Sequence, residues 1–448
     1  MLTNMKGGLL VIVALLAFMT GCSEKAVHHG TLLFTQAPGA NVSVESILSG
    51  GYKYADGLRI VQETSGSMEI LTDEFTSARA PEISYDGEIM VFSGKKTTAD
   101  AWQIWTLAFD TKSLTQVTST TENCTDPVWL PDGRIAFSKQ ITDDSQVKFH
   151  ALFTIDPSGC CEQRITFQPH DDMNASVMND GRLLFSSRQV YPERGALKYL
   201  AMRPDGTKAE IFYLPDSSVN TLNRACDTGA GKIAFSETGI YRTINFSRPM
   251  HSQEKPLIHG VDYLQSASSM EGESIMCSIL KSGSPVFGIA MINKDSQPDT
   301  SSEIHDAANH LIEAVVVRSR ELPRKLPSLM NMDDPSGYIV CLNAEASTIP
   351  ADLTYGKSSK IQVLDYTGLI GETEIESDGS FYVALPADQP LRFQTVNSEG
   401  KVVRGPSSWI WVRPSERRGC VGCHEDSEIT PENVVPKAVE KAPVAMIK

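Results

Sequence analysis

Hydrophobic and polar positions in the first two thirds of the chain follow one pattern that occurs five times. Each copy places a short polar turn between two apolar runs, and three copies carry Asp-Gly in the turn. Glycine adopts the positive φ that a tight hairpin needs, and the run after it, such as Ile-Ala-Phe at 135–137, is typical of a buried strand. The turn glycines are Gly87, Gly133, Gly181, Gly231 and Gly272. The pattern predicts a hairpin repeated at intervals of about 40 to 50 residues.

That interval is near the length of one four-stranded propeller blade. Short segments of related sequence, which end later strands, recur at 114–118, 163–166 and 209–212. A single sheet of this kind cannot bury both of its faces, so neighbouring sheets must stack around an axis. Five copies, and one blade shared between 31–72 and the stretch around 286–317, predict a propeller of about six blades.

A second alternating pattern follows a Pro-rich linker at 323–337. Strands are predicted at 338–342, 360–364, 380–385, 391–396 and 409–412, with turn residues between them. This pattern is typical of a small β-sandwich. A helix-like stretch is predicted at 303–313, before the linker.

The first 22 residues resemble a bacterial lipoprotein signal. Lys6 precedes an apolar run at 9–19, and Thr20-Gly21-Cys22 follows it. The run is about half of the ~20 apolar residues that a bilayer-spanning helix needs. We therefore expect an exported protein with a lipid anchor at Cys22, and Ser23 after that cysteine favours the outer membrane, facing the periplasm or the cell surface.

Charge limits the partners. The chain has 40 basic and 55 acidic residues, for a formal net charge of −15. An acidic surface repels nucleic acid and anionic lipid headgroups. We expect no nucleic-acid partner, and membrane contact through the lipid anchor.

The strongest chemical signal is Cys420-Val421-Gly422-Cys423-His424, a C-x-x-C-H motif. Two thiols at this spacing can form thioethers to one porphyrin, and the adjacent imidazole can bind its iron. A zinc site would need two further ligands, and export favours haem because c-type attachment is completed outside the cytoplasm. We predict one covalent haem c, with Cys420 and Cys423 as thioether positions and His424 as axial ligand.

The sequence leaves the sixth iron ligand open, although that ligand decides between electron transfer and an open reactive site. The candidates are His305, His310, Met330, Met332 and Met446. Trp409 and Trp411 could wall the porphyrin or could belong to the sandwich core. One of three arginines is expected to pair with a haem propionate, unless all are solvated: Arg413, Arg417 and Arg418.

Other motifs carry weaker signals. An even number of further cysteines suggests disulfides in an exported protein. The alternative is that they are buried as small hydrophobic residues. These cysteines are Cys124, Cys160, Cys161, Cys226, Cys277 and Cys341. Cys160 and Cys161 could pair with each other or with separate strands. His170-Asp171-Asp172 is a candidate metal cluster, for which a polar inter-blade loop is the alternative. Hydrolase and nucleotide-binding signatures are missing from the sequence.

Two family resemblances add to this interpretation. The repeats resemble those of the periplasmic Tol-Pal propeller protein. The stretch 408–426, with 385–394 before it, resembles the C-terminal haem region of proteins related to the hydrazine synthase alpha subunit. That resemblance covers roughly 75–440 in architecture and 380–445 in detail, and it implies the same roles for Cys420, Cys423 and His424. The family enzyme has a second, catalytic haem and works with other haem subunits, whereas this chain has one C-x-x-C-H motif, so hydrazine synthesis is not carried over.

The predicted fold is all-β: a propeller, a small β-sandwich and a short c-type haem segment. The expected division is 1–22 signal peptide, 23–322 propeller, 323–337 linker, 338–413 sandwich and 414–448 haem segment with tail. The predicted function is extracytoplasmic electron transfer, with the propeller docking a redox partner such as another cytochrome. Two alternatives remain: an oxidoreductase with an open iron site between propeller and haem, and a scaffold or sensor with a structural haem.

Overall fold

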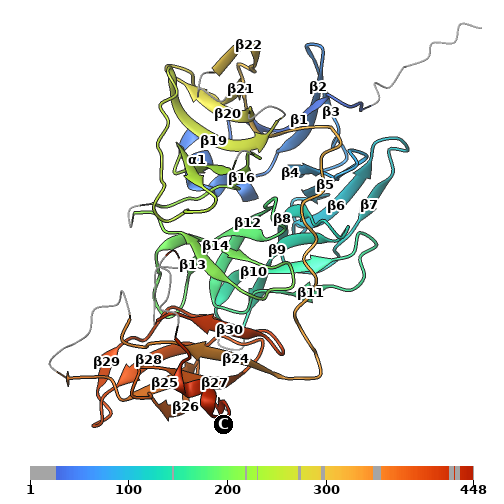
Figure 1. Cartoon of the computed structure of the whole chain (residues 1–448). Coiled ribbons are helices and arrows are strands. Elements are labelled where there is room, and N and C mark those ends of the chain that lie inside the picture. The colour runs from blue at the N-terminus through green and yellow to red at the C-terminus, as the bar shows by residue number, and fades with distance from the viewer. Residues whose placement is uncertain are drawn as a thin grey trace, which may run out of the picture.

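The computed structural model describes residues 27–143, 146–216, 219–229, 231–270, 274–293, 298–346, 355–422, 428 and 434–446. Within these ranges the chain forms eight sheets, six in a propeller and two in a smaller domain (Figure 1). The all-β prediction is confirmed, and so is the propeller followed by a sandwich. None of the helices in the described part of the chain is both long enough and apolar enough to cross a membrane.

In five propeller sheets the strands lie side by side in chain order, with the first strand of each nearest the axis. The first two are β4 (Ser77–Ile83), β5 (Ile89–Lys95), β6 (Gln103–Ala108), β7 (Leu114–Gln116), and β8 (Cys124–Trp129), β9 (Ile135–Thr142), β10 (Lys148–Ile155), β11 (Gln163–Arg164). The third and fourth are β12 (His170–Val177), β13 (Leu183–Gln189), β14 (Leu197–Met202), β15 (Glu210–Tyr213), and β16 (Cys226–Asp227), β17 (Lys232–Glu237), β18 (Ile240–Asn245). The fifth is β19 (Val261–Ser269), β20 (Ile275–Lys281), β21 (Gly288–Ile292) and β22 (Pro298–Ile304).

The sixth blade joins the two ends of the propeller sequence. Its order is β23-β1-β2-β3, with bounds β1 (Leu32–Pro38), β2 (Arg59–Thr64), β3 (Ser67–Ile70) and β23 (Asn309–Val316). The shared blade is therefore confirmed, although 288–304 belongs to the fifth sheet. Because β1 pairs antiparallel with β23 from Leu32↔Val316 to Pro38↔Asn309, this ladder closes the ring.

The repeated hairpins form as predicted at the turns that the structure describes, and Gly272 lies outside the described residues. Gly87, Gly133 and Gly181 have φ of 83°, 90° and 89° in the turns. The following strands are buried, as Ile135 and Phe137 show. Asp-Gly turns between apolar runs thus specify the first hairpin of each blade.

The helix predicted at 303–313 is wrong. β22 ends at Ile304 and β23 begins at Asn309. Between them the Asp306 carboxylate accepts hydrogen bonds from the backbone N–H groups of Ala308 (2.9 Å) and Asn309 (3.2 Å). An aspartate that caps a turn in this way competes with helix formation.

The sandwich has two four-stranded sheets. One contains β30 (Arg417–Cys420), β24 (Ser336–Cys341), β27 (Phe381–Pro386) and β31 (Val444–Ala445), and the other β26 (Gly368–Glu374), β25 (Lys360–Asp365), β28 (Arg392–Val396) and β29 (Val402–Arg404). Their facing side chains form one apolar core that includes Ile339, Val363 and Val383. Four predicted strands are present, and β30 and β31 bring the last part of the chain into the first sheet.

The strand predicted at 409–412 does not form, apart from one bridge between Leu391 and Ile410. The two tryptophans instead contact the propeller. Trp409 Nε1 donates to the carbonyl of Tyr191 (2.7 Å) and Trp411 Nε1 to that of Gly206 (3.0 Å). Trp411 is buried among propeller side chains, so it joins the two domains and belongs neither to a porphyrin wall nor to the sandwich core.

The linker follows the propeller down to the sandwich, as the orange trace in Figure 1 shows. Two backbone hydrogen bonds tie this part of the chain to hairpin turns: Arg320 N, just before the linker, donates to Tyr85 O (2.9 Å), and Arg324 N within it donates to Asn179 O (3.1 Å). The short helical elements are α1 (Val44–Ser49) and η1 (Gly51–Tyr54), between β1 and β2, and η4 (Lys437–Glu440) near the C-terminus.

Candidate functional site

Cys420, the first cysteine of the motif, ends the edge strand β30. This strand runs parallel to β24, with Cys420 beside Cys341. The pairing continues past the strand, because Leu342 N donates to Cys420 O (2.9 Å) and Asn343 N to Val421 O (3.1 Å). Cys420 is half-buried and packs against the sandwich core. The sheet thus holds this thiol at a rigid edge that remains partly open.

Gly422 allows the chain to pass close to a neighbouring loop. A Cβ at this position would lie 1.7 Å from the carbonyl oxygen of Ala346. Since that distance is far below any real contact, a side chain at position 422 would collide with the backbone of Ala346, and the motif needs glycine here. Cys423 and His424 lie outside the described residues, as does Cys22.

Glu428, four positions after His424, contacts the propeller. Its carboxylate accepts from Met250 N (2.5 Å) and lies 3.6 Å from the Arg248 guanidinium. The described residues on the two sides of the motif are therefore bound to different domains.

The three candidate arginines have different environments. Arg413 is buried, pairs with Asp388 (3.0 Å) and lies over the Phe167 ring. Arg418 pairs with Glu416 (3.0 Å). Arg417 is exposed, with its guanidinium over the Tyr338 ring. Arg413 and Arg418 therefore already have acidic partners, whereas Arg417 contacts an aromatic ring.

The candidate sixth ligands do not share one location. Met446 is buried in the sandwich core, whereas Met332 and His305 are exposed. Met330 Sδ accepts from Arg413 Nε (3.1 Å). His310 lies in the sixth blade, where Nδ1 accepts from Phe287 N (3.2 Å) and Nε2 lies 2.9 Å from Val42 O. Both nitrogens of His310 thus have protein partners, and burial lowers its pKa.

A second site, missed by the sequence interpretation, is a cavity of about 530 Å³ on the propeller axis. Its base contains polar residues from the innermost strands, including Asp126, Asn174, Gln265 and Glu313. Three of these residues have positive φ: Asp126 (55°), Asn174 (58°) and Glu313 (55°). A bulge accompanies Asp126 in β8 and Asn174 in β12, and bulges of this type re-aim side chains.

Buried charges connect the base of this cavity. Arg79 Nη2 contacts Asp126 (2.7 Å) and Glu313 (2.9 Å). Lys53 Nζ contacts Asp126 (3.2 Å) and Asn174. Burial disfavours the charged carboxylate of Asp126, but Arg79 and Lys53 outweigh it and hold its pKa below the usual range. Burial lowers the pKa of Lys53.

The helical segment between β1 and β2 supplies Lys53 and also fixes the base of the cavity. Tyr52 Oη donates to Glu313 (2.8 Å), and Tyr54 Oη lies 2.8 Å from His150 Nε2. Residues 318–321, between β23 and the linker, line the cavity at the other end. There Arg320 and Arg224 share one carboxylate, Glu82.

His170, Asp171 and Asp172 do not group as metal ligands among the described residues, and they lie in β12 rather than in the loop that the sequence favoured. His170 Nδ1 bonds to Ser187 Oγ (2.9 Å), and Asp171 contacts His150 (2.9 Å). Asp172 accepts from Gln168 (3.3 Å). Alternation along the strand puts Asp171 on the opposite face of β12 from His170 and Asp172, and His170 and Asp172 both bond to Ser187.

Most of the further cysteines are buried thiols. Cys124, Cys160, Cys161, Cys226 and Cys277 form no disulfide. Burial raises the pKa of Cys124 and of Cys226 to about 12. For these two and Cys277 the small-hydrophobic interpretation is supported. Cys160 and Cys161 are exposed and adjacent, with Sγ atoms 3.0 Å apart.

Comparison with known proteins bears on the motif directly. Residues 339–425, which contain the complete C-x-x-C-H sequence, match the family model described as the hydrazine synthase alpha subunit middle domain. The chain resembles the hydrazine synthase alpha subunit. The resemblance predicted from the sequence is thus confirmed.

The relatives give the extent of that likeness. A 60-residue stretch is 37% identical to hydrazine synthase subunit alpha of Kuenenia stuttgartiensis, and it covers 13% of this chain and 7% of that protein. The solved hydrazine synthase of the same organism shares the fold over 93% of this chain and 72% of its own, with a TM-score of 0.78 and 18% identity. TolB from Acinetobacter baumannii matches 64% of this chain and 66% of its own at 13% identity, with a TM-score of 0.45.

Proposed function

We propose that the protein is an exported, lipid-anchored c-type cytochrome that carries one covalent haem c and exchanges electrons with a protein partner, such as another cytochrome. The observation that carries this proposal is the complete C-x-x-C-H motif inside the segment that matches the family model. Cys420 and Cys423 would form the thioethers and His424 would bind the iron. The lipid would be attached at Cys22 and would hold the protein at the outer membrane.

The described residues around the motif fit such a group. The β24–β30 ladder fixes Cys420 while leaving this residue partly exposed, and a thioether position needs both. Gly422 keeps the chain close to Ala346, and Arg417 offers an exposed guanidinium beside the edge. When bound, the haem would supply one-electron redox chemistry. The propeller, fixed to the sandwich through Trp411 and the linker, would offer the docking surface for the partner.

The axial cavity favours one alternative, an oxidoreductase that admits a small substrate. Its volume of about 530 Å³ lies within the ~300–1,000 Å³ of typical ligand pockets. Its lining is polar and charged, with Asp126 and Glu313 at the base and Arg318 near the linker. A substrate there would be small and hydrogen-bonding.

Spectroscopy of protein matured with c-type assembly machinery tests both functions. We expect a covalent haem spectrum in the reduced wild type, and its loss in Cys423→Ala and His424→Ala. Cys161→Ser is the matched control, since it removes an exposed thiol outside the motif and should leave the spectrum unchanged. Full haem retention in both motif variants would contradict the assignment. Carbon monoxide separates the alternatives, because an unchanged Soret band supports electron transfer and a shifted band supports an open iron site.

A further inference from the structure

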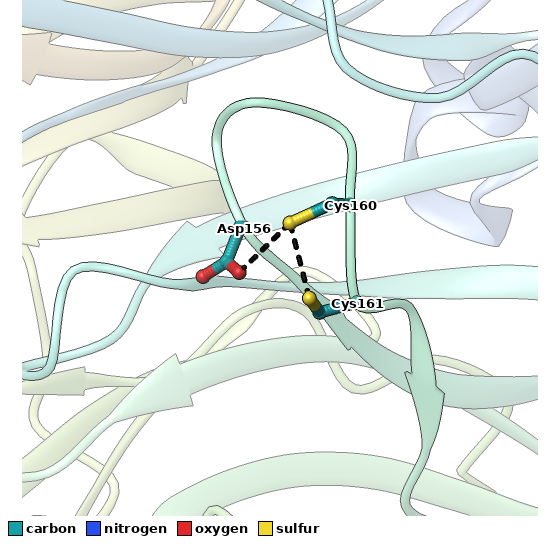
Figure 2. A group of neighbouring side chains, drawn as sticks. All are labelled: Asp156, Cys160 and Cys161. Atoms are coloured by element: carbon teal, nitrogen blue, oxygen red, sulfur yellow. Dashed lines mark hydrogen bonds between the residues drawn. The ribbon is translucent and has the colours of Figure 1, made fainter.

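The turn between β10 and β11 gathers three metal-binding side chains on the outer edge of the second blade. Figure 2 shows Asp156, Cys160 and Cys161 directed toward one another from this turn. Cys160 Sγ lies 3.2 Å from Asp156 Oδ2 and 3.0 Å from Cys161 Sγ. Their ligand atoms all lie within 4.8 Å of one another. Both thiols are exposed, so ions in solution can reach them.

The backbone fixes this arrangement. Gly159 N donates to Asp156 O (2.8 Å), and Asp156 N donates to Cys160 O (3.0 Å). Gly159 has φ of +84°, and a Cβ there would lie 2.9 Å from the carbonyl oxygen of Val117, so the turn rests against the preceding blade. Cys161 has φ of 61°, a conformation that ordinary side chains rarely adopt. The turn is thus closed, and only the side-chain torsions are adjustable.

A bound cation would balance the charge of this cluster. Two thiolates and the Asp156 carboxylate would place three negative charges within 4.8 Å of one another, and a divalent cation compensates two of them. The nearby Lys139 is engaged with Glu162, at 2.8 Å. A bound divalent cation would replace the two thiol protons and compensate the negative charge.

We infer that Asp156, Cys160 and Cys161 form a surface site for one thiophilic divalent cation of the Zn²⁺ class. The two thiols release two protons to solvent, and the ion takes two sulfur ligands and one carboxylate oxygen, with water in the fourth position. Two sulfurs and one oxygen select Zn²⁺ or Cd²⁺ over Mg²⁺ and Ca²⁺. With Zn–S bonds of about 2.3 Å in a tetrahedron, the sulfurs must separate to ~3.7 Å, a movement that exposed side chains can make by χ1 rotation.

Cadmium binding to the full chain tests this site. The background carries Cys22→Ser, Cys420→Ser and Cys423→Ser, so that the N-terminal and motif thiols do not compete. Titration should show one equivalent of Cd²⁺ with ultraviolet thiolate-to-metal absorption and release of about two protons. Cys160→Ser and Cys161→Ser should abolish that absorption, and Asp156→Asn should weaken binding at least tenfold. Glu162→Gln is the control and should bind as the background does.

Two outcomes would overturn the inference. Unchanged stoichiometry and absorption in both serine variants would assign the binding to other thiols. Isolation of the protein with Cys160 and Cys161 joined in a disulfide, with no Cd²⁺ binding after reduction, would assign the pair to redox chemistry alone. Circular dichroism of each variant separates loss of the site from loss of the fold.

Discussion

Arg79 is fully buried at the propeller axis, and its guanidinium contacts two carboxylates. Nothing in the local sequence marks it, because Asp126 and Glu313 come from two other blades. Burying such charges costs free energy unless each has a partner. The axial network is therefore sensitive to the loss of any one member.

The first prediction concerns Asp126. Asp126→Asn should destabilise the protein by about 3 to 5 kcal/mol, because it leaves one uncompensated positive charge in the buried network of Arg79, Lys53 and Glu313. Glu74→Gln is the control: Glu74 pairs with Lys96, and their side chains are 67% and 34% exposed, so its loss should cost at most about 1 kcal/mol. Denaturant unfolding of both variants measures the difference. Equal small effects would contradict the assigned role of the network.

The second prediction is a pH dependence from Asp172. This side chain is wholly buried, and burial raises its pKa to about 7 in spite of hydrogen bonds from Ser187, Thr166 and Gln168. In the unfolded chain the pKa of aspartate is about 3.9. Between these values the folded protein keeps a proton that the unfolded chain releases, so this group's contribution to stability is full below pH ~4 and falls until pH ~7.

Asp172→Asn should remove the loss of stability that Asp172 causes as the pH rises from about 4 to about 7. At pH 8 the variant should melt above the wild type by roughly 2 °C or more, and near pH 4 the difference should disappear. His170 acts in the opposite direction, because burial lowers its pKa and the unfolded chain gains a proton as the pH falls below ~6.5. Since both proteins keep His170, comparing their melting curves over pH isolates Asp172. A difference that does not vary with pH would exclude the proposed cause.

At the scale of elements, the hairpin turns do more than join strands. Gly181 has φ of +89°, and a Cβ there would lie 1.9 Å from the carbonyl oxygen of Arg324 in the linker. Gly133 has nearly the same φ, +90°, with nothing within 4 Å of that position. Equivalent turns of two blades thus differ only in the linker that crosses one of them.

That pair gives the third prediction. Gly133→Ala should cost about 1 kcal/mol, for the left-handed backbone alone. Gly181→Ala should cost clearly more and should displace the linker, because the backbone of Arg324 cannot yield as a side chain would. Unfolding free energies give the first comparison, and hydrogen exchange at residues 320–327 gives the second. Equal costs with unchanged exchange would show that the linker tolerates the methyl group.

The same elements show what sequence could predict. The blades were predictable because each hairpin turn and buried run is a local signal that recurs. β30 and β31 were not, since both are short, lack alternation and pair parallel with distant strands. The strand expected at Trp409 and Trp411 failed because contacts with the propeller outweigh β-propensity. For the C-x-x-C-H motif the haem chemistry stays a prediction from the sequence, and the structure adds the sheet edge that holds Cys420.

At the scale of the whole molecule, the sandwich is attached to the second and third blades. Arg413 Nη1 donates to Arg164 O (3.2 Å), and Glu416 Oε1 accepts from Lys208 N (2.7 Å). Trp411 is 1% exposed and packs with Val128, Leu183 and their neighbours in those blades. If the haem is held at the sandwich edge and the partner docks on the propeller, this interface sets the distance between them.

The last prediction tests that interface. Trp411→Ala should lose about 3 to 5 kcal/mol through the cavity it leaves, and it should loosen the sandwich from the propeller without unfolding either. Trp409→Phe is the control, because it keeps an aromatic ring against Tyr366 and Arg392 and loses the hydrogen bond to Tyr191, which is worth about 1 kcal/mol. Limited proteolysis reports the effect: Trp411→Ala should be cut faster at the linker, 323–337, to release two folded fragments. Cleavage at the wild-type rate would mean that the linker contacts, rather than Trp411, hold the two domains together.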